Sequence, residues 1–242
     1  MGLGTPAKLT MAPLCLGFAG GWVLGDLSSE NNLLTFLCQH AHVAVVSVNY
    51  RHAPEFPYPA AHDDALAALE WVASAAGSAE LGTDRLRIAL GGSSAGANLA
   101  LSTSLRAARL SSPIPLVFQL VTIPVCDNTA AAGEGPWALA PHAPWLTAAR
   151  MTWYRDMYFA TQEDAAEWKA SPGLAPAEVL AGAPRTWVAI SECDLLAEEA
   201  RRLVARLTQA GVDVEAVVYE GSTHSILSLD AQVARCRVVD CS

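Results

Sequence analysis

The chain has 242 residues, of which 52% are hydrophobic and 16% charged, and its formal net charge is −9 at pH 7. These proportions are typical of a globular protein, and the length suffices for one α/β domain with a sizeable core. The negative charge argues against nucleic acid and anionic membrane surfaces as partners.

The apolar segments and the cysteines bear on where the protein works. No segment reaches the roughly 18 uninterrupted apolar residues of a membrane span, and the apolar run 12–24 lacks the basic region that opens a signal peptide. The six cysteines are scattered without the paired spacing of a metal site, and most of them lie in or beside apolar segments. We therefore expect a cytoplasmic protein with free thiols, no bound metal and no stable membrane insertion.

Six short apolar runs alternate with helical patterns along the chain. The predicted strands are residues 13–18, 43–48, 86–90, 115–123, 186–191 and 214–219. The predicted helices are residues 60–76, 95–110, 147–159 and 195–210, with another that is capped by Ser28 or Ser29 and ends near Ala41. Because strands and helices alternate, we predict an α/β fold with a mostly parallel sheet and helices on both faces.

The segment from about 126 to 184 breaks this regularity. It is rich in Ala, Gly, Pro and Trp, and its one clear helical stretch is the predicted helix 147–159. We interpret residues 1–242 as a single domain that carries this segment as an irregular, cap-like insert. The insert is expected at the carboxyl ends of the strands, where the ligands of open α/β sheets bind.

A candidate nucleophile lies between the third predicted strand and the helix after it. There the segment Gly92–Gly96 reads Gly-Ser-Ser-Ala-Gly and matches G-x-S-x-G, whose glycines leave room for a strained turn that presents the serine hydroxyl. The pentapeptide by itself also fits an ordinary turn, but the flanking strand and helix favour a nucleophile. Ser94 is the candidate, because the pentapeptide centred on its rival Ser93 lacks the final glycine.

A serine hydroxyl needs a base within hydrogen-bond reach and a third group that orients the base. Asp194 follows the strand 186–191 and His224 follows the strand 214–219, which gives the chain order serine, acid, histidine. An aspartate there is also a common helix cap, and a lone loop histidine is usually a surface residue. The shared order and strand-end positions favour a triad of Ser94, Asp194 and His224. The other histidines lie in the insert (His142) or before the serine (His40, His42, His52 and His62).

Donors for an oxyanion are the remaining requirement of acyl transfer. The backbone N–H of Ala95 is one candidate, and Gly20 and Gly21, after the first predicted strand, supply the others unless they form a plain glycine turn. Trp22 and Ser93 are the candidate substrate contacts beside them. Aromatic residues of the insert that fit either the pocket or the core are Trp145, Trp153 and Tyr154.

Several segments in this order resemble the hormone-sensitive-lipase-like branch (family IV) of the α/β-hydrolases, the bacterial carboxylesterases with an H-G-G-G loop. The segments are Gly20–Asp26, Asn49–Glu55, Gly92–Gly96, Glu192–Asp194 and Gly221–His224. The resemblance implies an α/β-hydrolase fold and a serine carboxylesterase that hydrolyses small-molecule esters of short to medium acyl chains without a cofactor. It also implies that Tyr50–Glu55 is structural rather than catalytic.

The chain departs from the pattern of that branch at two positions near the site and at both ends. Phe18-Ala19-Gly20-Gly21 stands where the family has H-G-G-G, and Ser93 replaces the acidic residue usual before the nucleophile. Few residues precede the first strand, so we expect the N-terminal strands and cap of the family to be truncated. The resulting open sheet edge favours a homodimer or aggregation. The tail 230–242 lacks the expected amphipathic helix, and a fragment or an altered reading frame is the alternative to a complete chain.

Two other functions fit the same residues. A catalytically weakened or inactive ligand-binding homologue fits the loss of the loop histidine at Phe18 and the missing cap, whereas the intact triad argues against it. Amide or formamide hydrolysis is the third, and the sequence does not separate it from esterolysis.

Replacing Phe18 by histidine tests whether the altered loop weakens the enzyme. Deleting a whole oxyanion donor lowers kcat by ~10²–10³, and a loosened loop should lower it by less. Phe18→His is therefore expected to raise kcat in a steady-state ester hydrolysis assay. An unchanged or lower kcat would count against this interpretation.

Overall fold

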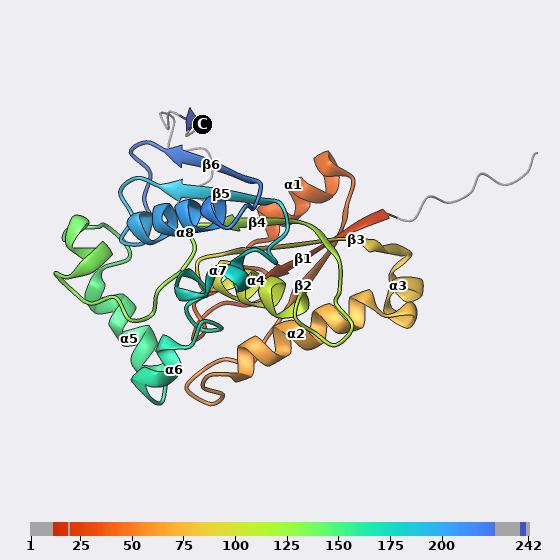
Figure 1. The fold of residues 1–242 in the computed structure, drawn as a ribbon, viewed down its shortest axis with the longest axis horizontal. Coiled ribbons are helices and arrows are strands. Elements are labelled where there is room, and N and C mark those ends of the chain that lie inside the picture. Colours follow the sequence, from red (N-terminus) through yellow and green to blue (C-terminus); the bar gives the residue numbers. More distant parts are fainter. Residues whose placement is uncertain (1–11, 19, 226–237, 241–242) are drawn as a thin grey trace, which may run out of the picture.

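Seven strands form one sheet in the computed structural model, which describes residues 12–18, 20–225 and 238–240, with the backbone alone for 12–16 and 238–240 (Figure 1). The strand order is β2-β1-β3-β4-β5-β6-β7, and all neighbouring pairs are parallel except β6 and β7. The strands are β1 (Ala12–Phe18), β2 (Ala44–Val48), β3 (Thr83–Ser93), β4 (Leu116–Thr122), β5 (Thr186–Ser191), β6 (Val214–Tyr219) and β7 (Val238–Asp240). The predicted strands are confirmed, whereas β7 is an addition to them.

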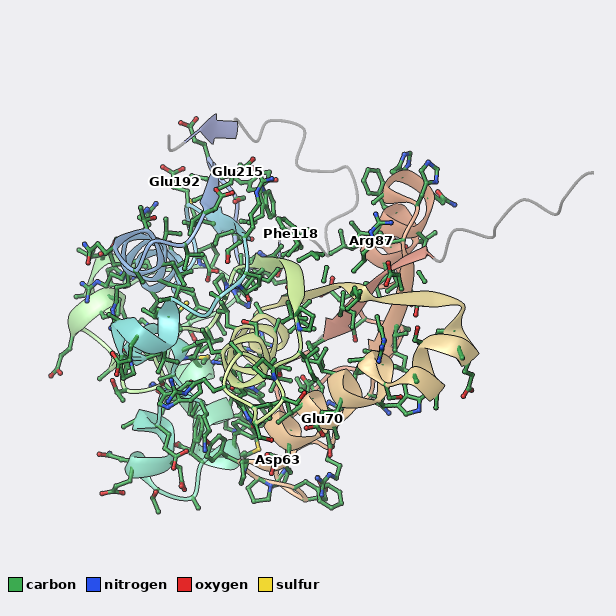
Figure 2. The ribbon with its side chains drawn as sticks, turned by 45° about the vertical axis from the view of Figure 1, so that its right-hand side comes forward. Asp63, Glu70, Arg87, Phe118, Glu192 and Glu215 are labelled. Carbon is green, nitrogen blue, oxygen red and sulfur yellow. The ribbon has the colours of Figure 1, made fainter. Side chains whose placement is uncertain are left out.

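Helices cover both faces of the sheet, as predicted. Figure 1 shows α1 on one side and α2, α4 and α8 on the other. The helices are α1 (Asn31–Ala41), α2 (Ala60–Ala73), α3 (Ala75–Leu81), α4 (Ala95–Ala107), α5 (Ala148–Tyr158), α6 (Gln162–Ala166), α7 (Ala177–Leu180) and α8 (Ala197–Gln209), with 3₁₀ turns η1 (Gly135–Leu139) and η2 (Pro172–Leu174). Many charged side chains lie on the outside of the molecule, among them Asp63, Glu70, Glu192 and Glu215 in Figure 2.

The predicted helix 60–76 is divided into α2 and α3 at Ser74. This residue adopts an extended conformation (φ −71°, ψ 158°), and its hydroxyl accepts a hydrogen bond of 3.0 Å from the N–H of Gly77. A serine that caps a new helix therefore interrupts an otherwise continuous helical pattern.

The start of α1 also differs from the prediction. Glu30 occupies the N-cap position without a side-chain cap, so neither Ser28 nor Ser29 caps this helix. The Asp26 side chain instead accepts hydrogen bonds from the N–H and the hydroxyl of Ser28, at 2.8 and 2.5 Å. The two serines therefore belong to a turn built around Asp26.

Helix α4 lies in the core between the sheet and α2. Every residue of α4 except Arg106 is buried, which explains its many small side chains. The hydroxyl of Ser104 donates to Gln119 Oε1 (2.7 Å), and Gln119 Nε2 donates to Thr186 Oγ1 (2.7 Å). This buried chain of hydrogen bonds joins α4 to β4 and β5, and therefore fixes the helix that follows Ser94 against the sheet.

Three cysteines, Cys38, Cys126 and Cys193, are free thiols, as expected. The side chain of Cys15 and the tail cysteines Cys236 and Cys241 lie outside the described part of the chain.

Gly92 is required where β3 meets α4, because the two segments approach each other closely. A Cβ at this position would lie 2.3 Å from Gly96 O and 2.7 Å from Ala97 N. Both contacts are with backbone atoms, which cannot move away without shifting α4. The elbow therefore excludes every residue larger than glycine at position 92.

We expect Gly92→Ala to lower the free energy of unfolding by at least about 2 kcal/mol, because overpacking against backbone displaces α4. Gly211→Ala is the matched control, since Gly211 has φ +84° and open space around its Cβ position. Its free energy of unfolding should fall by only ~1–2 kcal/mol, the cost of placing a residue with a Cβ in a left-handed conformation. Urea unfolding measures both, and a Gly92→Ala variant as stable as the wild type would contradict the steric argument.

Candidate active site

Ser94 lies at a sharp bend between the last residue of β3 and the first residue of α4. Its backbone has φ 56° and ψ −117°, a combination that is strained for a residue with a side chain. The N–H of Ser94 donates to Thr122 O at 3.0 Å, which ties the bend to the end of β4. The strained conformation expected of a nucleophile elbow is therefore present, and it directs the hydroxyl away from the sheet.

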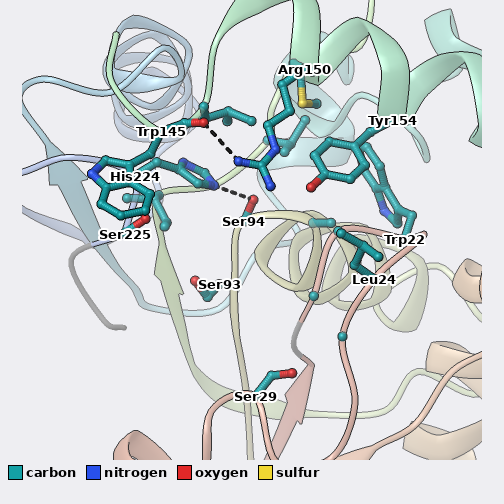
Figure 3. Close-up of a pocket in the computed structure, with 18 of the residues that line it drawn as sticks. Trp22, Leu24, Ser29, Ser93, Ser94, Trp145, Arg150, Tyr154, His224 and Ser225 are labelled. Atoms are coloured by element: carbon teal, nitrogen blue, oxygen red, sulfur yellow. Dashed lines mark hydrogen bonds between the residues drawn. The ribbon is translucent and has the colours of Figure 1, made fainter. Parts of the chain in front are cut away.

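The three residues of the predicted triad meet beyond the carboxyl ends of the strands. Ser94 Oγ lies 2.9 Å from His224 Nε2, and His224 Nδ1 lies 2.8 Å from Asp194 Oδ2 (Figure 3 draws the first of these contacts). The exposed fraction is 16% for the His224 side chain and 1% for that of Asp194. A buried carboxylate thus faces one ring nitrogen, and a hydroxyl facing the pocket lies against the other.

Hydrogen bonds between the loops after β5 and β6 hold Asp194 and His224 together. The N–H of Cys193 donates to Ser222 O at 2.8 Å, and the N–H of Gly221 donates to Glu192 Oε2 at 2.7 Å. Asp194 Oδ1 accepts from the N–H of Leu196 at 3.3 Å, ahead of α8. Asp194 is not the cap of α8, because Leu196 occupies that N-cap position without a side-chain cap. The carboxylate instead faces the histidine, as the triad requires.

The predicted oxyanion donors differ in whether their backbone N–H groups already form a hydrogen bond. Gly20 has φ +105°, and a Cβ there would lie 2.3 Å from Leu24 O, so only glycine fits. The N–H of Gly21 donates to Leu24 O at 2.8 Å and is occupied within its own turn. Among the hydrogen bonds between described residues, none uses the backbone N–H of Gly20 or Ala95. Gly20 and Ala95 remain predicted donors as they stand, whereas Gly21 serves only after its turn opens.

A pocket of about 370 Å³ opens above Ser94 and His224 (Figure 3). Its walls come from the glycine loop, the start of α1, the loop after β4 and the insert, which contributes residues from Trp145 to Tyr154. The segment 126–184 thus supplies part of the pocket, at the position predicted for it. Within the described part of the chain, no His, Cys, Asp and Glu side chains gather in a group of three or more that could hold a metal ion.

A family model described as "alpha/beta hydrolase fold" matches residues 18–228 of the chain. The chain belongs to the α/β-hydrolases. Within that family the match is to the hormone-sensitive-lipase-like branch that the sequence resembles.

The α/β-hydrolase is similar to an AB hydrolase superfamily protein of Schizosaccharomyces pombe (40% identity, covering 91% of this chain and 65% of that one). It is also similar to the ethyl acetate hydrolase of Pseudomonas putida (33%, covering 91% and 68%). Among solved structures, carboxyl esterase 2 of Tuber melanosporum superposes with a TM-score of 0.85 at 28% identity, covering 92% of this chain and 73% of that one. The chain therefore spans about two thirds of the length of these curated relatives.

The structure places the predicted substrate contacts of this α/β-hydrolase at different depths. Trp22 lines the pocket but is only 1% exposed, because its ring stacks on Tyr158 with a centroid distance of 4.8 Å. Ser93 lines the pocket together with Glu30, and the two residues also line a smaller cavity under α1. Trp145 and Tyr154 line the pocket, and Trp153 does not.

Phe18 and His62 are core residues rather than parts of the pocket. Phe18 is 1% exposed and packs in the hydrophobic core. An imidazole at this position would lose its hydrogen bonds to water, which costs stability unless a protein group replaces them. Both the kcat and the free energy of unfolding of Phe18→His must therefore be compared with those of the wild type. His62 contacts the Tyr158 hydroxyl (2.8 Å) and Asn98 Oδ1 (3.1 Å), and burial lowers its pKa to about 3, which keeps it neutral.

Two carboxyl groups that sequence reasoning missed support the pocket. Glu199 of α8 is buried and accepts hydrogen bonds from the N–H groups of Cys126 (2.9 Å) and Asp127 (3.0 Å) and from Trp137 Nε1 (2.5 Å). Glu30 lies at the wall shared by the pocket and a smaller apolar cavity under α1. Burial raises the pKa of each to about 7. Only tertiary contacts reveal these roles, since both residues look like ordinary helix positions in the sequence.

No helix in the described ranges is both long and apolar enough to cross a lipid bilayer.

The raised pKa of Glu30 predicts how stability depends on pH. Its folded pKa of about 7 exceeds the ordinary value of 4.5, so the folded state holds the proton more tightly than the unfolded state. This contribution to stability is complete below about 4.5 and is lost as the pH rises through about 7. We expect the free energy of unfolding to fall over this range, and to fall less in Glu30→Gln, which does not titrate.

Urea unfolding at pH 5 and pH 8 measures this difference. Glu178→Gln is the control, because Glu178 is exposed on α7, and it should keep the pH dependence of the wild type. A Glu30→Gln variant with the wild-type pH dependence would contradict the burial of this carboxyl group.

Proposed function

We propose that this α/β-hydrolase is a serine carboxylesterase that acts on small esters of short to medium acyl chains. The observation that carries the proposal is the hydrogen-bonded row Ser94–His224–Asp194 beneath a pocket of about 370 Å³. Pockets of this size suit small ligands. The name of the Pseudomonas putida relative, ethyl acetate hydrolase, supports a small ester as the substrate class.

In the proposed mechanism, Ser94 Oγ attacks the ester carbonyl carbon and its proton passes to His224 Nε2. Asp194 Oδ2 accepts the hydrogen bond from Nδ1–H and stabilises the imidazolium that forms. The N–H groups of Gly20 and Ala95 donate to the oxyanion of the tetrahedral intermediate. A third donor from Gly21 requires its bond to Leu24 O to break first.

The intermediate collapses when the C–O bond to the alcohol breaks, and His224 Nε2–H returns the proton to the leaving alkoxide. Water then attacks the acyl-Ser94 ester with His224 again as the base, which releases the acid and restores the serine hydroxyl. Each step uses only water and these side chains, so the mechanism calls on no cofactor and no metal.

The homodimer and the cytoplasmic location stay predictions. Among the described strands, β2 forms an edge of the sheet, where a second copy of the chain could pair.

Hydrolysis of 4-nitrophenyl butyrate tests the proposed function. Ser94→Ala is expected to lower kcat by at least about 10⁴-fold, because it removes the nucleophile. Ser112→Ala is the matched control and should retain the activity of the wild type, because Ser112 is exposed beyond the C-terminal end of α4 and does not line the pocket. Equal rates for the wild type and Ser94→Ala would remove the esterase proposal. Ligand binding by the wild type without any acyl-enzyme burst would favour a non-catalytic homologue.

A further inference from the structure

We propose that Arg150 and Tyr154 of α5 bind a carboxylate of the substrate, so that the preferred esters carry a negative charge. This inference rests on the proposed esterase function and names its substrate class. Three observations support it: both side chains line the pocket, no carboxylate in the described part of the chain pairs with Arg150, and the Tyr154 ring lies beside the glycine loop.

Arg150 reaches from the insert into the pocket that contains Ser94 and His224. Its N–H donates to Thr147 Oγ1 at 3.2 Å, which caps α5, and its guanidinium donates to Trp145 O at 3.3 Å. Figure 3 shows the guanidinium and the Tyr154 hydroxyl directed into the space above Ser94 and His224. A cation is therefore held close to where the ester would react.

The charge of Arg150 is uncompensated within the described part of the chain, because no carboxylate lies within ion-pair distance of it. Arg155 on the same helix differs, since its guanidinium donates to the carbonyls of Asn128 (2.5 Å) and Ala130 (2.7 Å). The arginines that pair with carboxylates are Arg51, Arg106, Arg185 and Arg202. A guanidinium has five N–H donors in a fork that matches a carboxylate, and the contact with Trp145 O leaves most of them available.

Tyr154 lies one helical turn after Arg150, on the same face of α5. Its ring packs over the glycine loop, since an ideal Cβ on Gly21 would be 3.7 Å from Tyr154 Cε1. The ring therefore lies beside the glycine loop, and Figure 3 shows its hydroxyl next to the guanidinium of Arg150. An anion between the two would receive donors from both side chains.

The other charges around the pocket do not cancel this site. Glu30 lines the same pocket from the start of α1, where it also borders the apolar cavity under that helix. Figure 3 shows its neighbours Ser29 and Ser93 on the opposite side of Ser94 from Arg150. The net charge of −9 gives the whole protein no general attraction for anions. A preference for an anionic ester must therefore come from Arg150 itself.

The carboxylate can belong to the acyl part or to the alcohol part of the ester, and two pairs of substrates separate these sources. Monoethyl glutarate is compared with ethyl pentanoate by ethanol release. The ester 4-acetoxybutanoate is compared with butyl acetate by acetate release. In each pair one compound carries the carboxylate and the other has a methyl group in its place.

The quantity to measure is the kcat/KM of the anionic ester divided by the kcat/KM of the neutral ester in the same pair. In at least one pair, Arg150→Gln is expected to lower this ratio about 10- to 100-fold, because the variant loses a hydrogen bond between charged groups. Tyr154→Phe should lower the same ratio about 3- to 10-fold. The neutral esters should change less than about threefold in Arg150→Gln. Arg109→Gln is the control, because Arg109 is exposed beyond the far end of α4, and it should leave both ratios unchanged.

Unchanged ratios in Arg150→Gln for both pairs, with the neutral esters still hydrolysed, would overturn this inference and leave the esterase function standing. Failure of the wild type to hydrolyse any of the four esters would instead contradict the proposed function and this inference together.

Discussion

The parallel register of β3, β4, β5 and β6 is the constraint on which the site depends. Ser93 at the end of β3 pairs with Thr122, and Ser191 at the end of β5 pairs with Tyr219 at the end of β6. Strands that run in the same direction end at the same edge, so the loops that follow them must meet there. Residues far apart in the chain therefore reach one another at this edge, and the loops that carry Asp194 and His224 are joined by hydrogen bonds between their neighbours.

The strained backbone at Ser94 persists because its surroundings hold it on both sides. The N–H of Ser94 is bonded to Thr122 O, and the helix that begins at Ala95 is buried along its whole length apart from Arg106. Gly92 gives that helix the room to approach β3. The free-energy cost of an unfavourable φ at a single residue is small compared with the stabilisation from burying such a helix.

Much of this arrangement could be predicted from sequence because it depends on local patterns. The apolar runs gave the strands, and chain order with strand-end position identified Ser94, Asp194 and His224, which the structure brings together. Ser74 escaped prediction because one capping serine divides a continuous helical pattern. The bond from Gly21 N–H to Leu24 O was missed as well, since the conformation of a glycine-rich turn is not set by its composition.

The polar groups around the pocket could not be predicted for a different reason. Glu30 faces Ser93, and Glu199 faces the start of the insert, only after the sheet has formed. The same holds for Arg150, whose place above the nucleophile follows from how α5 packs over the glycine loop. Helical position alone does not distinguish such side chains from solvated surface charges.

Intact-mass spectrometry after treatment with an organophosphonate tests most directly whether Ser94 is an activated nucleophile. The wild type should gain the mass of one covalent adduct, located on the peptide that contains Ser94. His224→Ala should react far more slowly, because the hydroxyl then lacks its base. No adduct on the wild type, or equal labelling of Ser94→Ala, would contradict the account.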